Sequence, residues 1–443
     1  MVFRLNLGRF SLDPEQFSGS FFVSPVRRSP SIRLPVPVDA ETSRPAPHHP
    51  FIQKMSDLSD APQTMVVETA SENNKRAATR ASFFLAGISV ATWAPLVPYA
   101  KARLDVDEAK FGFLLLFLGI GAVGCMPLCQ RAVERFGCRN VIGAGAAMIC
   151  VSLPLLATLS GMPAMAVTLL IFGAGLGFVD VAMNIQATLI ERQSGEQLMS
   201  GFHGLFSVGG IAGSLVGGSL LSAGANPLGV AGAMVAVIAA LMFRYARYLE
   251  SAGAGERTAS ALILPQGIVV LMGAMAIGCF LVEGAMLDWS ALFLTSVKSY
   301  AQDRAGFGYT AFAMTMAAGR LFGDMLITRF GPRAVIVSGG ILGAIGMCIA
   351  IAAPSGTGAI VGFAVCGIGC ANIVPILFAA AGRQKAMDPS AAISSITTLG
   401  YGGNLVGPAI VGFFAHAIGL HLAFALLAVL LLLAAFGGRK IEP

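Results

Sequence analysis

One short segment of this sequence occurs twice, 194 residues apart. The first copy, residues 134–139, reads Glu-Arg-Phe-Gly-Cys-Arg, and the second copy, residues 328–333, reads Thr-Arg-Phe-Gly-Pro-Arg. Three further pairs keep a similar separation: Gly173 and Gly367, Gly209 and Gly403, and Trp93 and Trp289. Landmarks that recur at one long separation predict a chain built from two structural halves on a common plan.

The amino-acid composition indicates the environment in which these halves fold. Only 12% of the residues are charged, 56% are hydrophobic, and the mean hydropathy is +0.76. Soluble domains carry about 25% charged residues, roughly twice this share. The apolar residues form long blocks, and a helical block of ~20 residues crosses the ~30 Å hydrocarbon core of a bilayer. The sequence therefore predicts an all-α integral membrane protein.

Twelve apolar blocks follow residue 80, and a polar linker divides them into two groups of six. We predict two pseudo-symmetric six-helix bundles, preceded by a disordered cytoplasmic extension that is rich in proline. That extension holds nine of the 22 prolines and no apolar run long enough to span a membrane. The boundaries are 1–80 for the extension, 81–246 for the first bundle, 247–266 for the linker, 267–437 for the second bundle and 438–443 for a cytoplasmic tail.

The basic residues predict the orientation in the membrane. One set of loops carries sixteen Lys and Arg residues, and the opposite set carries five. Because basic loops stay on the cytoplasmic side, both termini are predicted to be cytoplasmic, in a bacterial-type inner (plasma) membrane. The net charge of +6 is scattered over these short loops. A nucleic acid partner is therefore not expected.

The repeated turn carries a resemblance to a known family. The pattern is Arg-Phe-Gly, any residue and Arg, and it is preceded by the acid Glu134 in the first copy and by Thr328 in the second. Placed after the second and eighth of twelve helices, it resembles the major facilitator superfamily over residues 81–437. The resemblance implies two six-helix bundles that rock against each other. It also implies that this turn helps to lock one face of the protein during transport.

The fourth apolar block is similar to the fucose–proton symporter branch of that superfamily. Its run Gly175-Leu176-Gly177-Phe178-Val179-Asp180-Val181-Ala182-Met183-Asn184 matches the pattern of glycines, an acid and an Asn four residues later. The resemblance implies a role for Asp180 in proton coupling.

Two carboxyl groups lie inside apolar blocks, where an ionisable group costs roughly 2.5–3.5 kcal/mol on insertion scales. These are Asp180 in the fourth block and Glu283 in the seventh. We interpret both as proton-coupling residues facing a central cavity. The alternative for Asp180 is a structural carboxylate bonded by neighbouring helices, and for Glu283 a polar tie to another helix.

Five other polar or aromatic residues are candidates for contact with a substrate. Asn184 lies one turn after Asp180 on the same face. Tryptophans at two mouths suit stacking on a sugar, although interfacial aromatic belts explain each of them equally well. Lone amides bond either a substrate hydroxyl or a neighbouring helix. The candidates are Asn184, Trp93, Trp289, Asn372 and Asn404.

A third set of residues is expected to form a gate at the cytoplasmic end. Arg320 and Asp324 are spaced i, i+4, so they are expected to pair with each other. If the substrate is an anion, Arg320 instead becomes a binding residue, because it is the deepest cation. The complete set of gate candidates is Arg135, Arg139, His203, Arg320, Asp324, Arg329 and Arg333.

Together these features favour a secondary active transporter that binds a small solute between its halves and is coupled to protons. Uptake of a sugar or sugar derivative is the first expectation, and proton-driven export of drugs or metabolites is the alternative. A non-transporting membrane sensor is a second alternative. No enzymatic activity, metal or cofactor is expected, and the protein is expected to be a monomer in the lipid bilayer.

Overall fold

The computed structural model describes residues 53–196, 198–251 and 264–441. The chain divides into two units, Met1–Ala61 and Pro62–Pro443. In the first unit the structure describes only the beginning of helix α1. The side-chain interactions of the described residues lie within the second unit.

The described residues form helices and contain no strand. The first half contains α1 (Gln53–Leu104), α2 (Glu108–Thr158), α3 (Met162–Ser194), α4 (Met199–Ser222), α5 (Pro227–Tyr245) and the short η1 (Ala246–Tyr248). The second half contains α6 (Ile268–Leu292), η2 (Phe293–Val297), η3 (Gln302–Arg304), α7 (Phe307–Leu321), α8 (Gly323–Phe330), α9 (Pro332–Ala352), α10 (Gly356–Cys370), α11 (Ile373–Arg383), α12 (Pro389–Ile418) and α13 (Leu420–Gly438).

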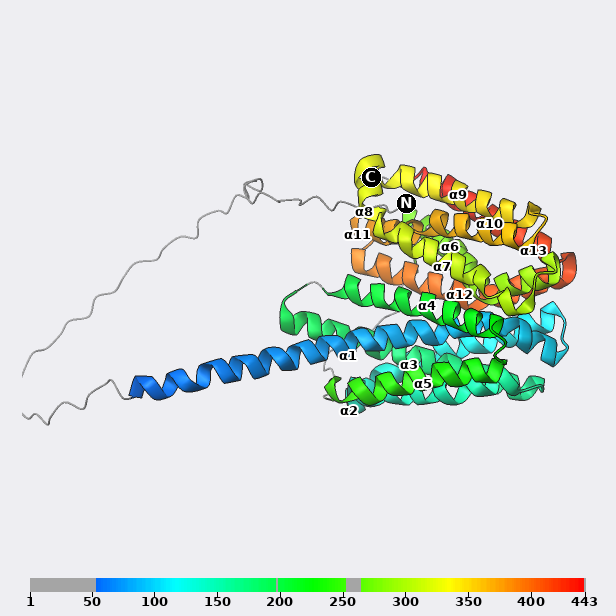
Figure 1. Ribbon diagram of the computed structural model, residues 1–443. Coiled ribbons are helices and arrows are strands. Elements are labelled where there is room, and N and C mark those ends of the chain that lie inside the picture. Colours follow the sequence, from blue (N-terminus) through cyan, green and yellow to red (C-terminus); the bar gives the residue numbers. More distant parts are fainter. Residues whose placement is uncertain (1–52, 197, 252–263, 442–443) are drawn as a thin grey trace, which may run out of the picture. The chain divides into compact units, whose positions relative to one another are not determined.

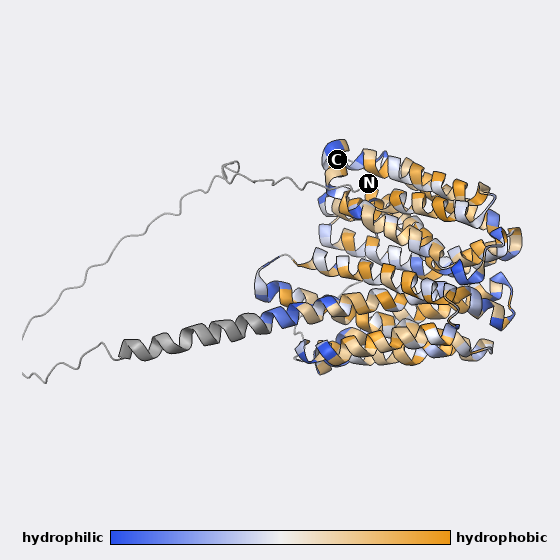
Figure 2. Ribbon diagram, in the orientation of Figure 1, coloured by the Kyte–Doolittle hydropathy of each residue, from blue (hydrophilic) through white to orange (hydrophobic). Residues whose placement is uncertain are grey.

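These helices are apolar enough to cross a bilayer, as the composition predicted. Within the described residues, nine helical segments have the length and hydropathy of membrane spans. Orange, hydrophobic residues run along most of them, and blue, hydrophilic residues gather towards their ends (Figure 2). One of the nine, α2, contains two predicted blocks in 51 residues, with non-helical backbone at Gly137. The count of twelve spans stays a prediction, whereas the all-α membrane fold is confirmed.

The helices form two groups that follow the order of the sequence. Figure 1 shows α1–α5, blue to green, on one side and α6–α13, yellow-green to red, on the other. Across the boundary, α2 packs on α12 and α4 packs on α7. These two pairings are related by the repeat, because the part of α2 before Gly137 corresponds to α7 and α8, and α4 corresponds to α12. The two halves therefore meet through equivalent helices.

The repeated turn has the same conformation in both halves. Gly137 has φ 77° and ψ 162°, and Gly331 has φ 80° and ψ 154°. Positive φ at these values is disfavoured for residues with a Cβ, so glycine is required at both turns. The arginine two residues before each glycine stacks on the following phenylalanine: the distance is 5.2 Å for Arg135 on Phe136 and 5.4 Å for Arg329 on Phe330.

Helix packing repeats with the same separation. A Cβ atom at Gly173 would collide with the carbonyl oxygen of Leu118, and one at Gly367 would collide with the carbonyl oxygen of Phe312. Leu118 and Phe312 are themselves 194 residues apart. Small residues at such positions let helix backbones approach closely, which is how helices associate in lipid.

The two tryptophans do not occupy equivalent positions. Gly209 lies against Phe84 of α1, and its counterpart Gly403 lies against Ile277 of α6. Phe84 and Ile277 are 193 residues apart, so equivalent positions of α1 and α6 differ by 193. The residue of α6 that is equivalent to Trp93 is therefore residue 286. Trp289 is three residues further along, almost one helical turn. The prediction of matching tryptophans was therefore wrong by one turn, because the separation is shorter in these first helices.

The predicted disordered extension reached residue 80, but α1 already includes residues 53–80; residues 1–52 lie outside the described residues. Residues 65–80 contain neither Pro nor Gly and include Ala, Glu, Lys and Arg, which favour helix. Two ion pairs also hold this segment: Lys75 Nζ lies 2.6 Å from Glu250, and Arg76 lies 2.9 Å from Glu196. The prediction of disorder rested on the prolines of the earlier residues, and it therefore missed this helix.

Aspartates outside the apolar segments begin two of the helices. Asp107 accepts a hydrogen bond from the backbone N–H of Lys110 at 2.8 Å, and this bond holds its pKa below the ordinary value. Asp388 accepts bonds from the Ser390 hydroxyl at 2.6 Å and from the Ala391 N–H at 3.1 Å, which lower its pKa in the same way. Such caps satisfy N–H groups that have no partner within the helix.

The close approach at Gly173 gives a stability prediction. Gly173→Val should destabilise the protein by about 1–3 kcal/mol, because the side chain would be forced against the backbone of α2. The melting temperature of the purified protein in detergent should fall. Gly124→Val is the matched control, since a Cβ atom there meets nothing within 4 Å. An equal melting temperature for the two variants would contradict the packing described here.

Candidate functional site

The two halves touch at one end of the helices and separate towards the other. We name the end that carries Lys101 the closed end, and the end that carries the turns at Gly137 and Gly331 the basic end. The candidate site lies between these ends, where polar side chains from both halves interrupt the apolar helices.

A buried hydrogen bond joins the halves near the closed end. The Trp93 indole Nε1 of α1 donates to Asp288 Oδ1 of α6 at 3.2 Å. Trp93 is fully buried and Asp288 is almost so. Ser222 of α4 also donates to the backbone oxygen of Asp303 in η3 at 3.1 Å. These bonds make the closed end a direct junction between the halves.

Trp289 supports the same junction from the second half. It is fully buried, its Nε1 donates to the Pro408 carbonyl at 3.2 Å, and its ring meets Phe111 of α2 edge-on at 6.0 Å. Both tryptophans were predicted to bind substrate at open mouths. The structure instead places them in packed contacts, because their nitrogens find partners that are 119 or more residues away in the sequence.

Towards the basic end, the facing surfaces of α4 and α7 part. Gly218 of α4 lies against the ring of Phe307 at the start of α7. Along the same face of α7, exposure rises to 47% at Met314 and 85% at Leu321. On the facing side of α4, a Cβ atom at Gly204 would meet nothing within 4 Å. An opening between the halves therefore reaches from the basic end towards the junction.

Asp180 and Asn184 lie together on α3, as their spacing predicted. The Asn184 amide donates to the Asp180 backbone oxygen at 2.8 Å and lies 3.5 Å from its carboxylate. Both residues are partly exposed. No ion pair to Asp180 occurs within the described residues. Asp180 therefore retains an acidic group that is reachable by water and has no cation bound to it.

Glu283 of α6 has a partner that the sequence did not reveal. Its Oε1 lies 3.4 Å from Nη2 of Arg320 on α7. The predicted pair between Arg320 and Asp324 is absent, because α7 ends at Leu321 and α8 begins at Gly323. This break rotates Asp324 away from the i, i+4 position on a continuous helix. The deepest cation is thus paired with a carboxylate in the middle of the second half.

Two helix interruptions lie side by side around Arg320. α10 ends at Cys370 and α11 begins at Ile373, and the break between α7 and α8 faces this gap. Arg320 Nε donates to the Ala371 carbonyl at 3.2 Å, and Asn372 Nδ2 donates to the Gly319 carbonyl at 3.0 Å. Broken helices in membranes need such partners for the backbone groups that they release. Asn372 therefore ties two helices together in this structure.

Asn404 and one residue not predicted lie on α12. Asn404 is exposed, and its Oδ1 lies close to Gly284 of α6. Tyr401 is also exposed; its ring stacks on Phe280 at 6.3 Å, and its hydroxyl lies within electrostatic range of Asp180 in the other half. Tyr401 could have been predicted from the sequence, because its phenol lies near the polar Asn404 in an otherwise apolar helix.

The other gate candidates gather at the basic end without joining the halves. His203 meets Phe83 edge-on at 5.1 Å and lies within electrostatic range of Arg320. The backbone N–H of Arg139 donates to the Glu250 carbonyl at 2.9 Å. The gate candidates with exposed side chains there are Arg135, Arg139, His203, Asp324, Arg329 and Arg333. Their gating role stays a prediction.

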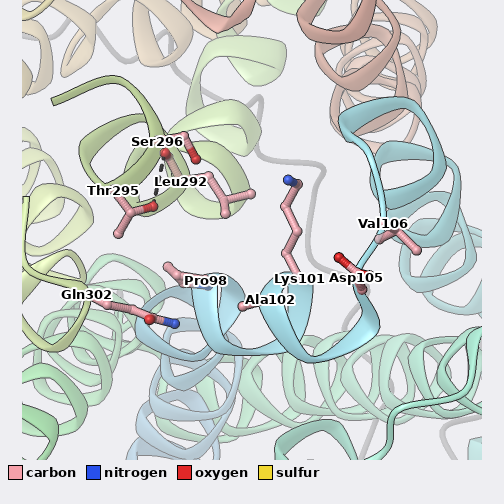
Figure 3. A pocket seen from close by; sticks show the side chains of 9 residues that line it. All are labelled: Pro98, Lys101, Ala102, Asp105, Val106, Leu292, Thr295, Ser296 and Gln302. Carbon is pink, nitrogen blue, oxygen red and sulfur yellow. Dashed lines mark hydrogen bonds between the residues drawn. The ribbon is translucent and has the colours of Figure 1, made fainter. Parts of the chain in front are cut away.

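A small polar pocket of about 270 Å³ lies outside the junction, at the closed end. Lys101 reaches it from α1 and Asp105 from the turn after α1, and Thr295 and Ser296 lie across from them (Figure 3). Lys101 also pairs with Glu108 at 3.0 Å. Within the described residues, no group of three or more His, Cys, Asp or Glu side chains is placed to hold a metal ion.

Comparison with known proteins identifies the family to which this chain belongs. A family model described as Major Facilitator Superfamily matches residues 81–308 and 284–439. This chain belongs to that superfamily. An uncharacterized MFS-type transporter of Yersinia pestis is 44% identical over 368 residues, which covers 83% of this chain and 96% of that protein. The protein is therefore a multi-pass membrane protein of the transporter type.

Solved structures with low sequence identity share the major facilitator fold. A mutant form of the nucleoside transporter NupG is 14% identical and superposes with a TM-score of 0.67, covering 84% of this chain and all of that one. A variant of the E. coli fucose:proton symporter FucP is 17% identical with a TM-score of 0.53, covering 83% of this chain and 98% of that one. At these identities the likeness concerns the fold.

The bond between Trp93 and Asp288 gives a prediction about this major facilitator protein. Trp93→Phe should favour opening at the closed end by about two- to tenfold, since a net hydrogen bond contributes roughly 0.5–1.5 kcal/mol. The measurement is the labelling rate of a cysteine introduced in a cysteine-free background at Val97, which is fully buried one turn after Trp93 on α1. Thr168→Val is the control, because the buried Thr168 hydroxyl donates to the Ala164 carbonyl at 2.8 Å within α3 and touches only one half. Unchanged labelling in Trp93→Phe would show that this bond does not hold the halves together.

Proposed function

We propose that this protein moves a small polar solute across the membrane by alternating access, coupled to protons. The observation that carries the proposal is the one-sided opening: the halves meet at Trp93 and Asp288, and they separate along α4 and α7 towards the basic end. Such an arrangement is one of the two states that rocking bundles require. The second state would form when the junction opens and the basic end closes.

The proton is assigned to the two carboxyl groups beside the opening. Asp180 is partly exposed and Glu283 has 21% of its side chain exposed. Ionisable side chains inside membrane spans mark proton and substrate pathways, because placing them there is costly. Asp180 supplies a site that takes up a proton while it faces the solution on one side of the membrane and releases it while it faces the other.

The solute is proposed to be small and able to accept several hydrogen bonds, such as a sugar or sugar derivative. Asn184, Asn404 and Tyr401 supply amides and a phenol from both halves. A second candidate function is proton-driven export of a more apolar compound. The exposed surfaces of Met314, Leu321 and Phe322 at the opening favour that alternative.

The orientation follows from the charges at the two ends. Because Lys and Arg are concentrated at the basic end, we place that end and both termini in the cytoplasm, with the protein as a monomer in a bacterial-type inner membrane. In that orientation the structure corresponds to a state open to the cytoplasm.

Removal of the Asp180 carboxyl tests the proton role. Asp180→Asn should reduce pH-gradient-driven accumulation in liposomes at least tenfold, because the amide cannot exchange a proton, while solute exchange without a gradient persists. Flux is measured with solutes found by a thermal-shift screen. Glu72→Gln, which removes an exposed carboxylate of α1 that lies outside the opening and the repeated turns, serves as the control. Undiminished accumulation in Asp180→Asn would remove Asp180 from the mechanism.

A further inference from the structure

The pair of Glu283 and Arg320 has a geometry that suits exchange of partners. Glu283 Oε1 and Arg320 Nη2 are 3.4 Å apart, and 21% of the Glu283 side chain and 37% of the Arg320 side chain are exposed. A tight guanidinium–carboxylate pair has distances of about 2.7–2.9 Å and often forms two parallel bonds. The pair is therefore loose, and solvent from the opening reaches both partners.

Arg320 is held in place by groups other than Glu283. Its Nε donates to the Ala371 carbonyl at 3.2 Å, and its Nη2 lies 3.6 Å from Met316 Sδ. The Ala371 carbonyl is fixed at the interruption between α10 and α11. Within the described residues, Nη1 has no hydrogen-bond partner. The guanidinium thus keeps its position if the carboxylate of Glu283 leaves, and its outer edge is free to bind another anion.

We propose that Arg320 binds the carboxylate of an anionic solute, and that this carboxylate replaces Glu283, which then takes up one proton. The inference rests on the proposed transport function and narrows its solute to a small monoanion such as a sugar acid. One Arg–carboxylate contact is broken and one is formed. The solute brings one negative charge and the proton one positive charge, so the net charge of the site is unchanged.

The charged groups around Glu283 explain why binding of the solute carboxylate to Arg320 is linked to uptake of a proton by Glu283. Among the residues that the structure describes, the titratable groups within electrostatic range of Glu283 are Arg320 and Tyr309 of α7, Cys279 of α6 and Cys370 of α10. Of these, Arg320 alone is a cation. A solute that takes Arg320 therefore removes the one positive partner in that set, and an unpaired carboxylate in an apolar span favours its neutral form.

An anion also fits this site better than a neutral solute does. If Glu283 is protonated while nothing replaces it, the guanidinium remains as an uncompensated charge among apolar helices, which is costly. A sugar hydroxyl relieves this only in part, whereas a carboxylate restores the pair. His203 from the other half also lies within electrostatic range of Arg320.

The test compares probes that differ in charge and little in size. Full-length protein in detergent is titrated with D-glucuronate, D-glucose and D-glucosamine, and with lactate and lactamide, by thermal shift and calorimetry. We expect stabilisation by at least one carboxylate and weaker effects from its neutral and cationic counterparts. Preference for a neutral or cationic probe, or no stabilisation by either carboxylate, overturns the proposal.

Proton uptake distinguishes exchange of partners from simple anion binding. In weakly buffered solution with a pH indicator, binding of the carboxylate should take up close to one proton per anion. Glu283→Gln should still bind the carboxylate but lose this uptake, and its affinity should become independent of pH. Full uptake in Glu283→Gln, or none in the unaltered protein, overturns the exchange.

Variants of Arg320 complete the test. Arg320→Gln should weaken carboxylate binding at least tenfold, with Arg131→Gln, an exposed arginine of α2, as the matched control. Because Arg320→Gln leaves Glu283 without its partner, the double variant Glu283→Gln/Arg320→Gln is included; it has no unpaired charge and should fold, yet not bind the carboxylate. Normal binding by the double variant overturns the proposal.

Liposome flux separates this inference from the transport function. If neutral glucose is driven by a pH gradient through Asp180 and carboxylates do not compete, proton-coupled transport stands and the anion inference falls. If carboxylates bind through Arg320 but no probe crosses the membrane, the binding site stands and the proposed transport falls.

Discussion

The hydrogen bond from Trp93 to Asp288 is the interaction on which the arrangement of the two halves depends. It joins α1 to α6 in a buried place, where a polar group that loses its partner is penalised. The packing of α2 on α12 and of α4 on α7 crosses the same boundary between the halves. Because the opposite end lacks such a junction among the described residues, the halves can separate there and expose Arg320 and Asp180. The closed end thus fixes which end of the site is accessible.

The backbone follows the repeat, but the chemistry does not. Gly173 and Gly367 occupy equivalent packing positions, and the turns at Gly137 and Gly331 have the same dihedral angles. In contrast, α3 is continuous, whereas its counterpart is broken into α10 and α11 beside Asn372. The position equivalent to Asn372 in the first half is Phe178. The two halves therefore share a backbone plan, but the second half has an ion pair and broken helices, whereas the first half has a lone carboxyl group.

Predictions at the site succeeded where the interaction is local in the sequence. Asn184 bonds Asp180 because residues four apart share a helix face. The sequence also identified Glu283 and Arg320 as unusual charges in apolar segments. It could not pair them, since they are 37 residues apart on different helices, and the break at Phe322 removed the local pair with Asp324. The prediction that both tryptophans bind substrate was wrong for a related reason. An indole at an open mouth and an indole in a packed junction have the same sequence pattern.

The sequence alone determined the all-α membrane fold, the two halves and the turn glycines. These follow from block length, hydropathy and a fixed separation, which are properties of neighbouring residues in lipid. The tertiary structure decided that Trp93 meets Asp288, that Arg320 meets Glu283 and that the opening lies at the basic end. Such outcomes depend on how whole helices rotate and tilt against one another. A shift of one residue in a helix turns a side chain by about 100°, so no local pattern fixes which distant partner it reaches.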